Sequence, residues 1–251
     1  MKKTVIGLCL MSFFGFATTA QAEVKVSGSL DIAYYSDYIG AISGQNIYDH
    51  SVFQQSLLVN FAPANIYAMV WSSYSPRGGF DSDFGDEVDW VIGITRSYFG
   101  VDFDLSYTYY DLYDIGDNDG DLHGIFLVMD FPQIISLNPY LKIECDIPFD
   151  NEILDGGLTY RFGASYDLEF SETFGSRIVT FDASIAGHDG AYGTEPELIS
   201  SGKLAISTTF NLWKVNVTPE VSLQERFDKN VENGGMTQSK VWYGIKCCLP
   251  F

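Results

Sequence analysis

Residues 101–110 read VDFDLSYTYY, and this stretch decides the fold because apolar and polar side chains alternate along it almost without a break. A period of two is that of a β-strand, since a helix with a period of 3.6 would not sort the residues this way. Such a strand covers the core of a soluble protein, or it turns its apolar face to lipid and its polar face to the lumen of a barrel. The apolar face would hold Val101, Phe103, Leu105, Tyr107 and Tyr109, and the polar face Asp102, Asp104, Ser106 and Thr108.

The same pattern recurs about twelve times along the chain. The connections after the odd-numbered strands are mostly long and acidic, whereas the others are mostly short, which is typical of a barrel with periplasmic turns and extracellular loops. A soluble β-sandwich is less favoured, because twelve apolar faces with 16% aromatic residues exceed what one core needs. We therefore predict an all-β fold, a transmembrane antiparallel β-barrel of about 12 strands. The expected strands are 24–35, 52–61, 66–74, 88–95, 101–110, 124–131, 141–147, 157–169, 178–188, 203–210, 215–224 and 240–251.

The amino terminus has the pattern of a secretory signal peptide. Lys2 and Lys3 precede a mostly apolar run over 5–17, and Ala20-Gln21-Ala22 offers the small residues of a cleavage site. The run is short for a spanning helix, and nothing later in the chain offers the ~20 apolar residues that such a helix needs. We predict a cleaved signal peptide at 1–22 and an outer-membrane barrel at 23–251, in a Gram-negative cell.

The charge of the chain is strongly negative, at −19. Loss of the two signal lysines would leave 12 Lys and Arg against 33 Asp and Glu, a net charge of −21. Such acidity disfavours nucleic acid and other anionic partners, and it favours cations at long range. Small solutes and outer-membrane lipid with its lipopolysaccharide are the partners expected from the predicted location in the outer membrane, and the sequence leaves the oligomeric state open.

The carboxy-terminal residues resemble the assembly signature of outer-membrane barrels. Phe251 is last, and Tyr243, Ile245, Cys247 and Leu249 precede it at alternate positions. This pattern predicts recognition by the barrel-assembly machinery through Phe251. A proline at position 250 departs from the signature, because it removes a backbone donor near the strand end.

Several short motifs together resemble the TorF-type family of Gram-negative outer-membrane porins. The likeness covers mainly the first half of the chain, and Gly40-Ala41 stands where the family usually has an Arg-Gly pair. The resemblance implies an outer-membrane barrel with a channel role and no defined substrate. It rests on Ser36-Asp37-Tyr38, Ile42-Ser43, Tyr67-Ala68, Val70-Trp71, Ser73, Glu87, Asp89, Gly93 and the Asp- and Tyr-rich strand at 101–110.

The polar faces of the predicted strands would place more acids than bases in the lumen. Rings of acids attract cations, so we predict passive diffusion of small neutral or cationic solutes. Internal pairing of opposite charges is the alternative, because it would plug a narrow barrel and leave a structural or adhesin-type protein. The acids are Asp31, Asp89, Asp102, Asp104, Asp130, Glu144, Asp146, Asp167, Glu169, Asp182 and Glu220, and the bases are Lys25, Lys142, Arg161, Lys203, Lys240 and Lys246.

Catalytic and metal-binding functions are less favoured by the sequence than a channel. His50, His123 and His188 lie near expected strand ends, but no serine stands in a recognisable nucleophile context, so an outer-membrane hydrolase is the less favoured alternative. The acidic loop 111–121 lacks the glycine position of an EF-hand, which favours a solvated loop over a calcium site. Three cysteines outside the signal form no disulfide framework, although a link from Cys145 to Cys247 or Cys248 stays open. We expect no cofactor.

Overall fold

The computed structural model describes residues 24–43, 46–48, 50–76, 86–112, 121–132, 137–149, 156–172, 175–191, 196–227 and 239–251. The predicted signal peptide, most of the acidic loop 111–121 and several other loop segments lie outside these residues. Among the residues that the structure describes, no helix is long and apolar enough to span a membrane.

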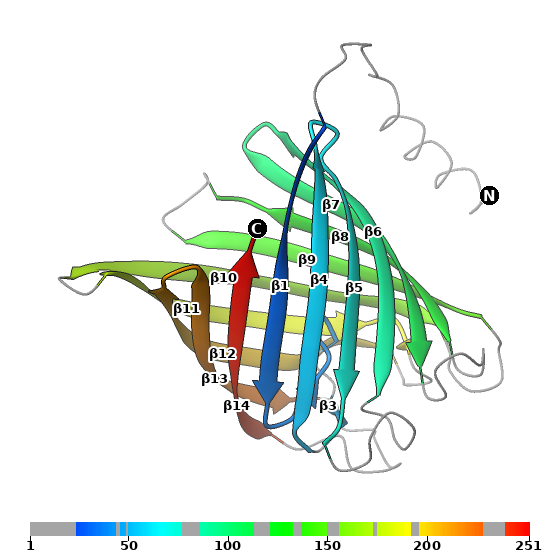
Figure 1. The fold of residues 1–251 in the computed structure, drawn as a ribbon. Helices are drawn as coiled ribbons and strands as arrows, with labels where there is room; N and C mark the ends of the chain where they lie inside the picture. Colours follow the sequence, from blue (N-terminus) through cyan, green and yellow to red (C-terminus); the bar gives the residue numbers. More distant parts are fainter. Residues whose placement is uncertain are drawn as a thin grey trace.

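Twelve antiparallel strands form a closed barrel, which confirms the predicted fold class (Figure 1). Each strand pairs with its neighbour in the chain order, and β1 closes the ring by pairing with β14. Two further short strands pair only with each other, β2 (Tyr38–Ile39) and β3 (Asn46–Tyr48). The barrel strands are β1 (Lys25–Tyr35), β4 (Val52–Ala62), β5 (Ile66–Tyr74), β6 (Glu87–Tyr98), β7 (Val101–Leu112), β8 (Leu122–Asp130), β9 (Asn138–Pro148), β10 (Gly157–Glu172), β11 (Gly175–His188), β12 (Glu197–Leu212), β13 (Val215–Arg226) and β14 (Lys240–Pro250).

The register sorts the side chains of each barrel strand onto two faces. In β7, Tyr107 pairs with Ile92 of β6 and Ile125 of β8, so the apolar side chains of neighbouring strands share one face. Large apolar residues on this face are exposed, among them Trp90 at 54% and Phe162 at 54%. This is the outer face of the barrel. The polar residues that alternate with them form the inner face, as a strand period of two requires.

Backbone pairing continues to the last residue of the chain. Pro250 lies opposite Ser29, and beyond it Phe251 and Gly28 exchange two hydrogen bonds, each of 2.9 Å. Pro250 therefore does not end the contact between β14 and β1, which run side by side in Figure 1. The barrel consequently has no open edge.

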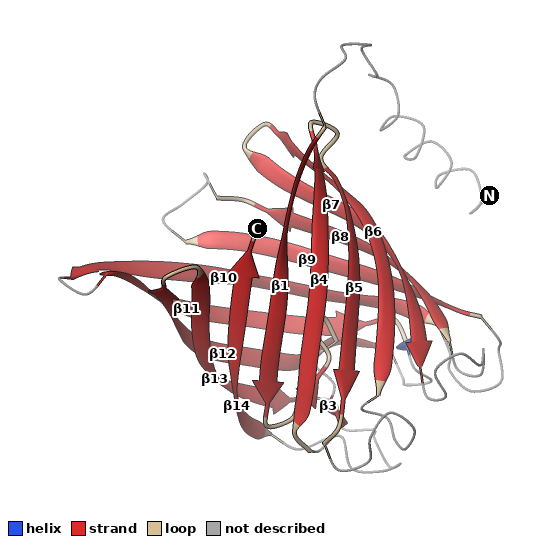
Figure 2. Cartoon of the chain, in the orientation of Figure 1, coloured by secondary structure: helices blue, strands red, loops and turns tan. Residues whose placement is uncertain are grey.

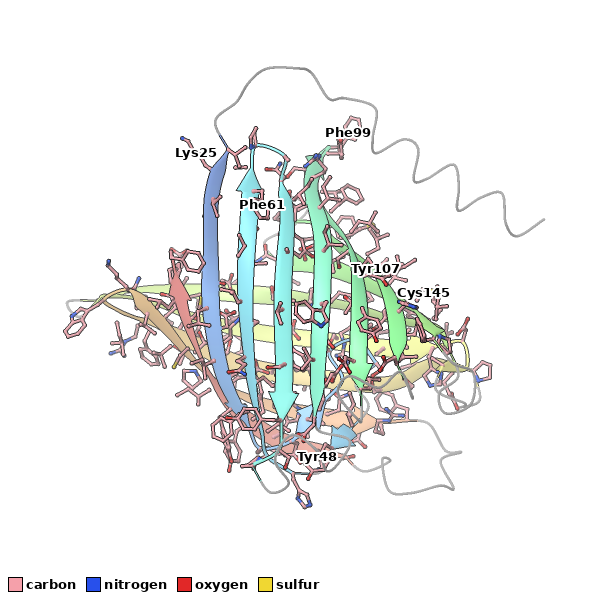
Figure 3. The ribbon with its side chains drawn as sticks, turned by 45° about the vertical axis from the view of Figure 1, so that its right-hand side comes forward. Lys25, Tyr48, Phe61, Phe99, Tyr107 and Cys145 are labelled. Carbon is pink, nitrogen blue, oxygen red and sulfur yellow. The ribbon has the colours of Figure 1, made fainter. Side chains whose placement is uncertain are left out.

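Short turns gather at one end of the barrel and long connections at the other, as predicted. We call these the turn end and the loop end. Lys25, Phe61 and Phe99 mark the turn end in Figure 3, and Tyr48 lies at the loop end. Figure 2 shows that strands make up almost all of the described barrel wall.

The bounds of several strands and the structure of the first loop differ from the sequence-based expectations. The structure extends β10 and β12 to 16 residues each, beyond the predicted 157–169 and 203–210. The first loop, residues 36–51, contains the β2–β3 hairpin. Pro219 lies inside β13, as in the predicted strand 215–224, although proline disrupts a central strand. The ladder between β12 and β13 skips this point, and a 3.0 Å hydrogen bond between Thr209 and Thr218 spans the gap.

Candidate functional site

The register places every charged residue that the sequence predicted for the lumen on the inner face of the barrel. These residues come from ten of the twelve barrel strands, so no single pair of strands forms the site. Their role in binding or conducting a solute is a prediction. On the inner face lie the candidate pore-lining residues Asp31, Asp89, Asp102, Asp104, Lys142, Glu144, Asp146, Arg161, Asp167 and Asp182.

Half of the predicted inner-face bases form ion pairs. The Nζ atom of Lys246 lies 2.7 Å from Asp31, and that of Lys203 lies 3.2 Å from Glu220. Lys240 contacts Asp37 of the first loop at 2.5 Å. Many of the acids that the register places on the inner face have no such cationic partner among the described residues. The pairing is therefore partial, and acids stay in excess.

A repeated arrangement of three strands fixes some of these acids. Tyr140 on β9 covers Gly163 on β10, where an added Cβ would lie 2.5 Å from the tyrosine ring. Beyond the glycine, the Tyr140 hydroxyl donates a 2.9 Å hydrogen bond to Asp182 on β11. The glycine is required because any larger side chain would meet the ring. The tyrosine thus reaches over one strand to hold a carboxylate on the next.

Two further tyrosines repeat this arrangement. Tyr67 on β5 covers Gly93 on β6, and its hydroxyl donates a 2.8 Å hydrogen bond to Asp104 on β7. Tyr110 on β7 lies 2.8 Å from the Cβ position of Gly124 on β8 and donates to Glu144 on β9. Three inner-face carboxylates are therefore set in place by neutral donors rather than by bases, and a neutral donor does not cancel the charge of an ionised carboxylate.

A group of buried acids lies toward the loop end. Glu87, Asp89, Glu144 and Asp146 are each less than a tenth exposed. Glu87 accepts a hydrogen bond from Tyr38. Glu144, which already accepts one from Tyr110, accepts another of 3.2 Å from Thr159. Among the residues with described positions, no group of three or more His, Cys, Asp or Glu side chains is arranged to hold a metal ion.

The first loop folds into the barrel and contacts its inner face. The Nε atom of Arg161 donates a 3.1 Å hydrogen bond to the carbonyl of Ile42, which is buried. The next residue, Ser43, accepts a hydrogen bond of 3.4 Å from the Ser201 hydroxyl. Tyr38 packs against Trp71, with ring centroids 6.0 Å apart. The loop therefore narrows the lumen from inside, and strands on several sides of the barrel hold it.

An open cavity of about 250 Å³ lies inside the barrel, and Ala41 of the first loop forms part of its wall. Its other lining is mainly polar and carries both signs of charge. Solutes passing along the barrel would meet this mixed lining beside the narrowing made by the loop. The charged groups and the aromatic side chain of the lining are Tyr140, Lys142, Arg161, Asp182, Lys203 and Glu220.

The histidines lie on separate elements. His123 of β8 belongs to the outer face, where its Nδ1 atom lies 2.6 Å from the Tyr107 hydroxyl. His188, at the end of β11, is buried, and His50 precedes β4. Cys145, Cys247 and Cys248 are free thiols, so the structure contains none of the disulfides that the sequence left open.

Sequence reasoning missed the tyrosine-glycine-acid arrangement and the inward fold of the first loop. A signal for the first was present, because Gly93 and Gly163 interrupt the polar faces of strands next to tyrosine-bearing strands. The inward fold of the first loop was only faintly indicated in the sequence, by the apolar residues Tyr38 and Ile42.

The closed barrel with a polar interior is the fold of outer-membrane porin-type proteins. Among solved structures, the KdgM porin matches with a TM-score of 0.54 and 7% identity, covering 89% of this chain and 99% of its own. The NanC porin matches with a TM-score of 0.53 and 10% identity, covering 88% of this chain and 98% of its own. No family model matches the chain, and a search of curated proteins finds no match. The resemblance to the TorF-type family stays a prediction.

Proposed function

We propose that this chain is a passive outer-membrane channel for small neutral or cationic solutes. The observation that carries the proposal is a closed barrel with an apolar outer face and an inner face on which fixed acids exceed bases. An exposed apolar belt of this extent suits lipid, and fixed acids attract cations and repel anions. The likeness in fold to the KdgM and NanC porins supports the proposal of a channel.

The position of the acids supports a preference for cations. Asp102 and Asp130 face each other across β7 and β8 near the turn end, and Asp104 follows one step further inside. Glu87 and Asp89 lie near the opposite end. A cation that enters from the turn end would therefore meet carboxylates first, which raises its local concentration relative to an anion.

The narrowing by the first loop supports a small solute size. Its backbone lies against Arg161 and Ser201, so the open cross-section is smaller than the twelve-stranded wall alone would leave. Export by the signal peptide, insertion through Phe251 and contact with lipopolysaccharide belong to the same proposal.

Liposome swelling tests passive diffusion of neutral solutes. The mature chain, refolded into vesicles, should admit arabinose faster than the larger sugar raffinose, because the lumen is narrow. Vesicles without protein give the baseline rate. A folded barrel that swells at the baseline rate with both sugars would contradict the proposal and favour the structural or adhesin-type alternative, in which ion pairs and the inward loop close the lumen.

A further inference from the structure

The cavity beside the first loop contains two cations without ionic partners. Among the described residues, Lys142 forms no ion pair, and its Nζ atom lies 5.2 Å from the centre of the Tyr140 ring. Arg161 uses Nε for the Ile42 carbonyl and Nη1 for Ser184, at 2.8 Å, and makes no other hydrogen bond within the described structure. Its Nη2 donors are therefore left for another acceptor.

Lys142 and Arg161 lie directly opposite each other on β9 and β10. Two adjacent cations that line one cavity form a suitable site for a carboxylate, because the arginine offers its remaining Nη2 donors in a fixed position and the lysine adds a mobile donor. Arg161 is 3% exposed, and its bonds to Ile42 and Ser184 fix its guanidinium before any ligand arrives. The site is thus preorganised.

A carboxylate without an ionic partner lines the same cavity. Asp182 accepts the Tyr140 hydroxyl at 2.9 Å and forms no ion pair among the residues described. Lys142 lies over the ring of the same Tyr140 whose hydroxyl bonds Asp182. The cation and the anion therefore contact different parts of one side chain and form no ion pair with each other among the described residues. The nearby Lys203 and Glu220 neutralise each other at 3.2 Å and leave the other three charges to act on a solute.

From this arrangement we infer that the cavity binds small zwitterions whose ammonium and carboxylate groups are several bonds apart, such as a dipeptide. The solute carboxylate contacts Lys142 and Arg161, and its ammonium group contacts Asp182. A zwitterion has no net charge, so this inference rests on the proposed channel for neutral and cationic solutes and names one class among them. Solutes that carry only one of the two charges bind less tightly, because they leave part of the site unpaired.

Isothermal titration calorimetry on the refolded mature chain in detergent tests the inference without requiring conductance. Glycylglycine is the probe, and N-acetyl-glycylglycine and glycylglycine amide each lack one of its charges. We expect saturable binding of glycylglycine and at least about tenfold weaker binding of either analogue, as the loss of a charged hydrogen bond implies.

Two variants separate the ends of the site. Lys142→Met keeps the stem over the Tyr140 ring and removes the charge, and Asp182→Asn keeps an acceptor for the tyrosine hydroxyl. Each should weaken glycylglycine binding at least about tenfold, whereas Glu225→Gln, on the outer face of the barrel, should not.

Conductance of the same protein preparation, measured after its transfer to a planar bilayer, tests the proposed function separately from the binding site. A conducting channel that shows no saturable glycylglycine binding overturns the zwitterion site alone. Analogues that bind as tightly as glycylglycine overturn it as well, since one charge would then suffice. A folded barrel that neither conducts nor binds overturns both.

Discussion

Tyr140 donates a 2.9 Å hydrogen bond to Asp182 across the intervening strand β10, directly over Gly163. The same geometry joins Tyr67 to Asp104 over Gly93. A tyrosine that lies flat against the wall and ends on a carboxylate fixes three strands relative to one another. It also fixes the position of a charge in the lumen.

Gly163→Ala should destabilise the barrel. The added Cβ would lie 2.5 Å from the Tyr140 ring, so the ring must move away and lose its bond to Asp182. We expect the free energy of unfolding to fall by about 1–3 kcal/mol, measured by urea titration in lipid vesicles. Gly202→Ala is the control, because its Cβ would come no closer than 3.3 Å, to the end of the Phe227 side chain. Equal losses for the two variants would contradict the arrangement.

Arg161→Met should release the first loop and raise single-channel conductance. The substitution removes both side-chain hydrogen bonds of Arg161, including the one to Ile42 in the loop. Lys142→Met removes the same charge from the residue opposite on β9, for which no bond to the loop is present in the described structure. Both variants should shift ion selectivity toward cations, but only Arg161→Met should enlarge the conductance steps. Larger steps in both would show that charge alone sets the conductance.

Deletion of Phe251 should weaken closure of the barrel. The two hydrogen bonds between Phe251 and Gly28 lie beyond Pro250, which has no backbone donor of its own. Their loss should lower the free energy of unfolding by about 1–3 kcal/mol, and the folded fraction recovered from urea should fall with it. Phe251→Tyr keeps the backbone and an aromatic side chain, so it should refold like the unchanged chain. Refolding of the deleted chain at the unchanged level would argue against this role.

The alternation of side chains predicted the fold and most of the inner face, because a period of two leaves no choice of face once the register is known. Asp102 and Asp104 were assigned from that pattern alone, and the structure places them on the inner face. Strand ends were less predictable. In β12 the segment 197–202 joins the sheet because β11 offers it a partner as far as His188.

Contacts between segments far apart in the sequence could not be predicted. The bond from Arg161 to Ile42 joins residues 119 positions apart, and nothing near either residue indicates the other. The pairing of Tyr140 with Asp182 spans 42 positions and depends on the glycine between them. The cavity is built from such contacts, so its mixed charges follow from the pairing of the strands and not from any single stretch of sequence.

The central claim is a lumen that conducts and prefers cations, and the reversal potential of single channels in a salt gradient measures it most directly. The unchanged chain should show discrete steps and a reversal potential of the sign that cation selectivity gives. Asp102→Asn combined with Asp104→Asn should move that potential toward zero, whereas Glu225→Gln, on the outer face, should leave it unchanged. A folded chain without steps, or steps with anion selectivity, would contradict the account.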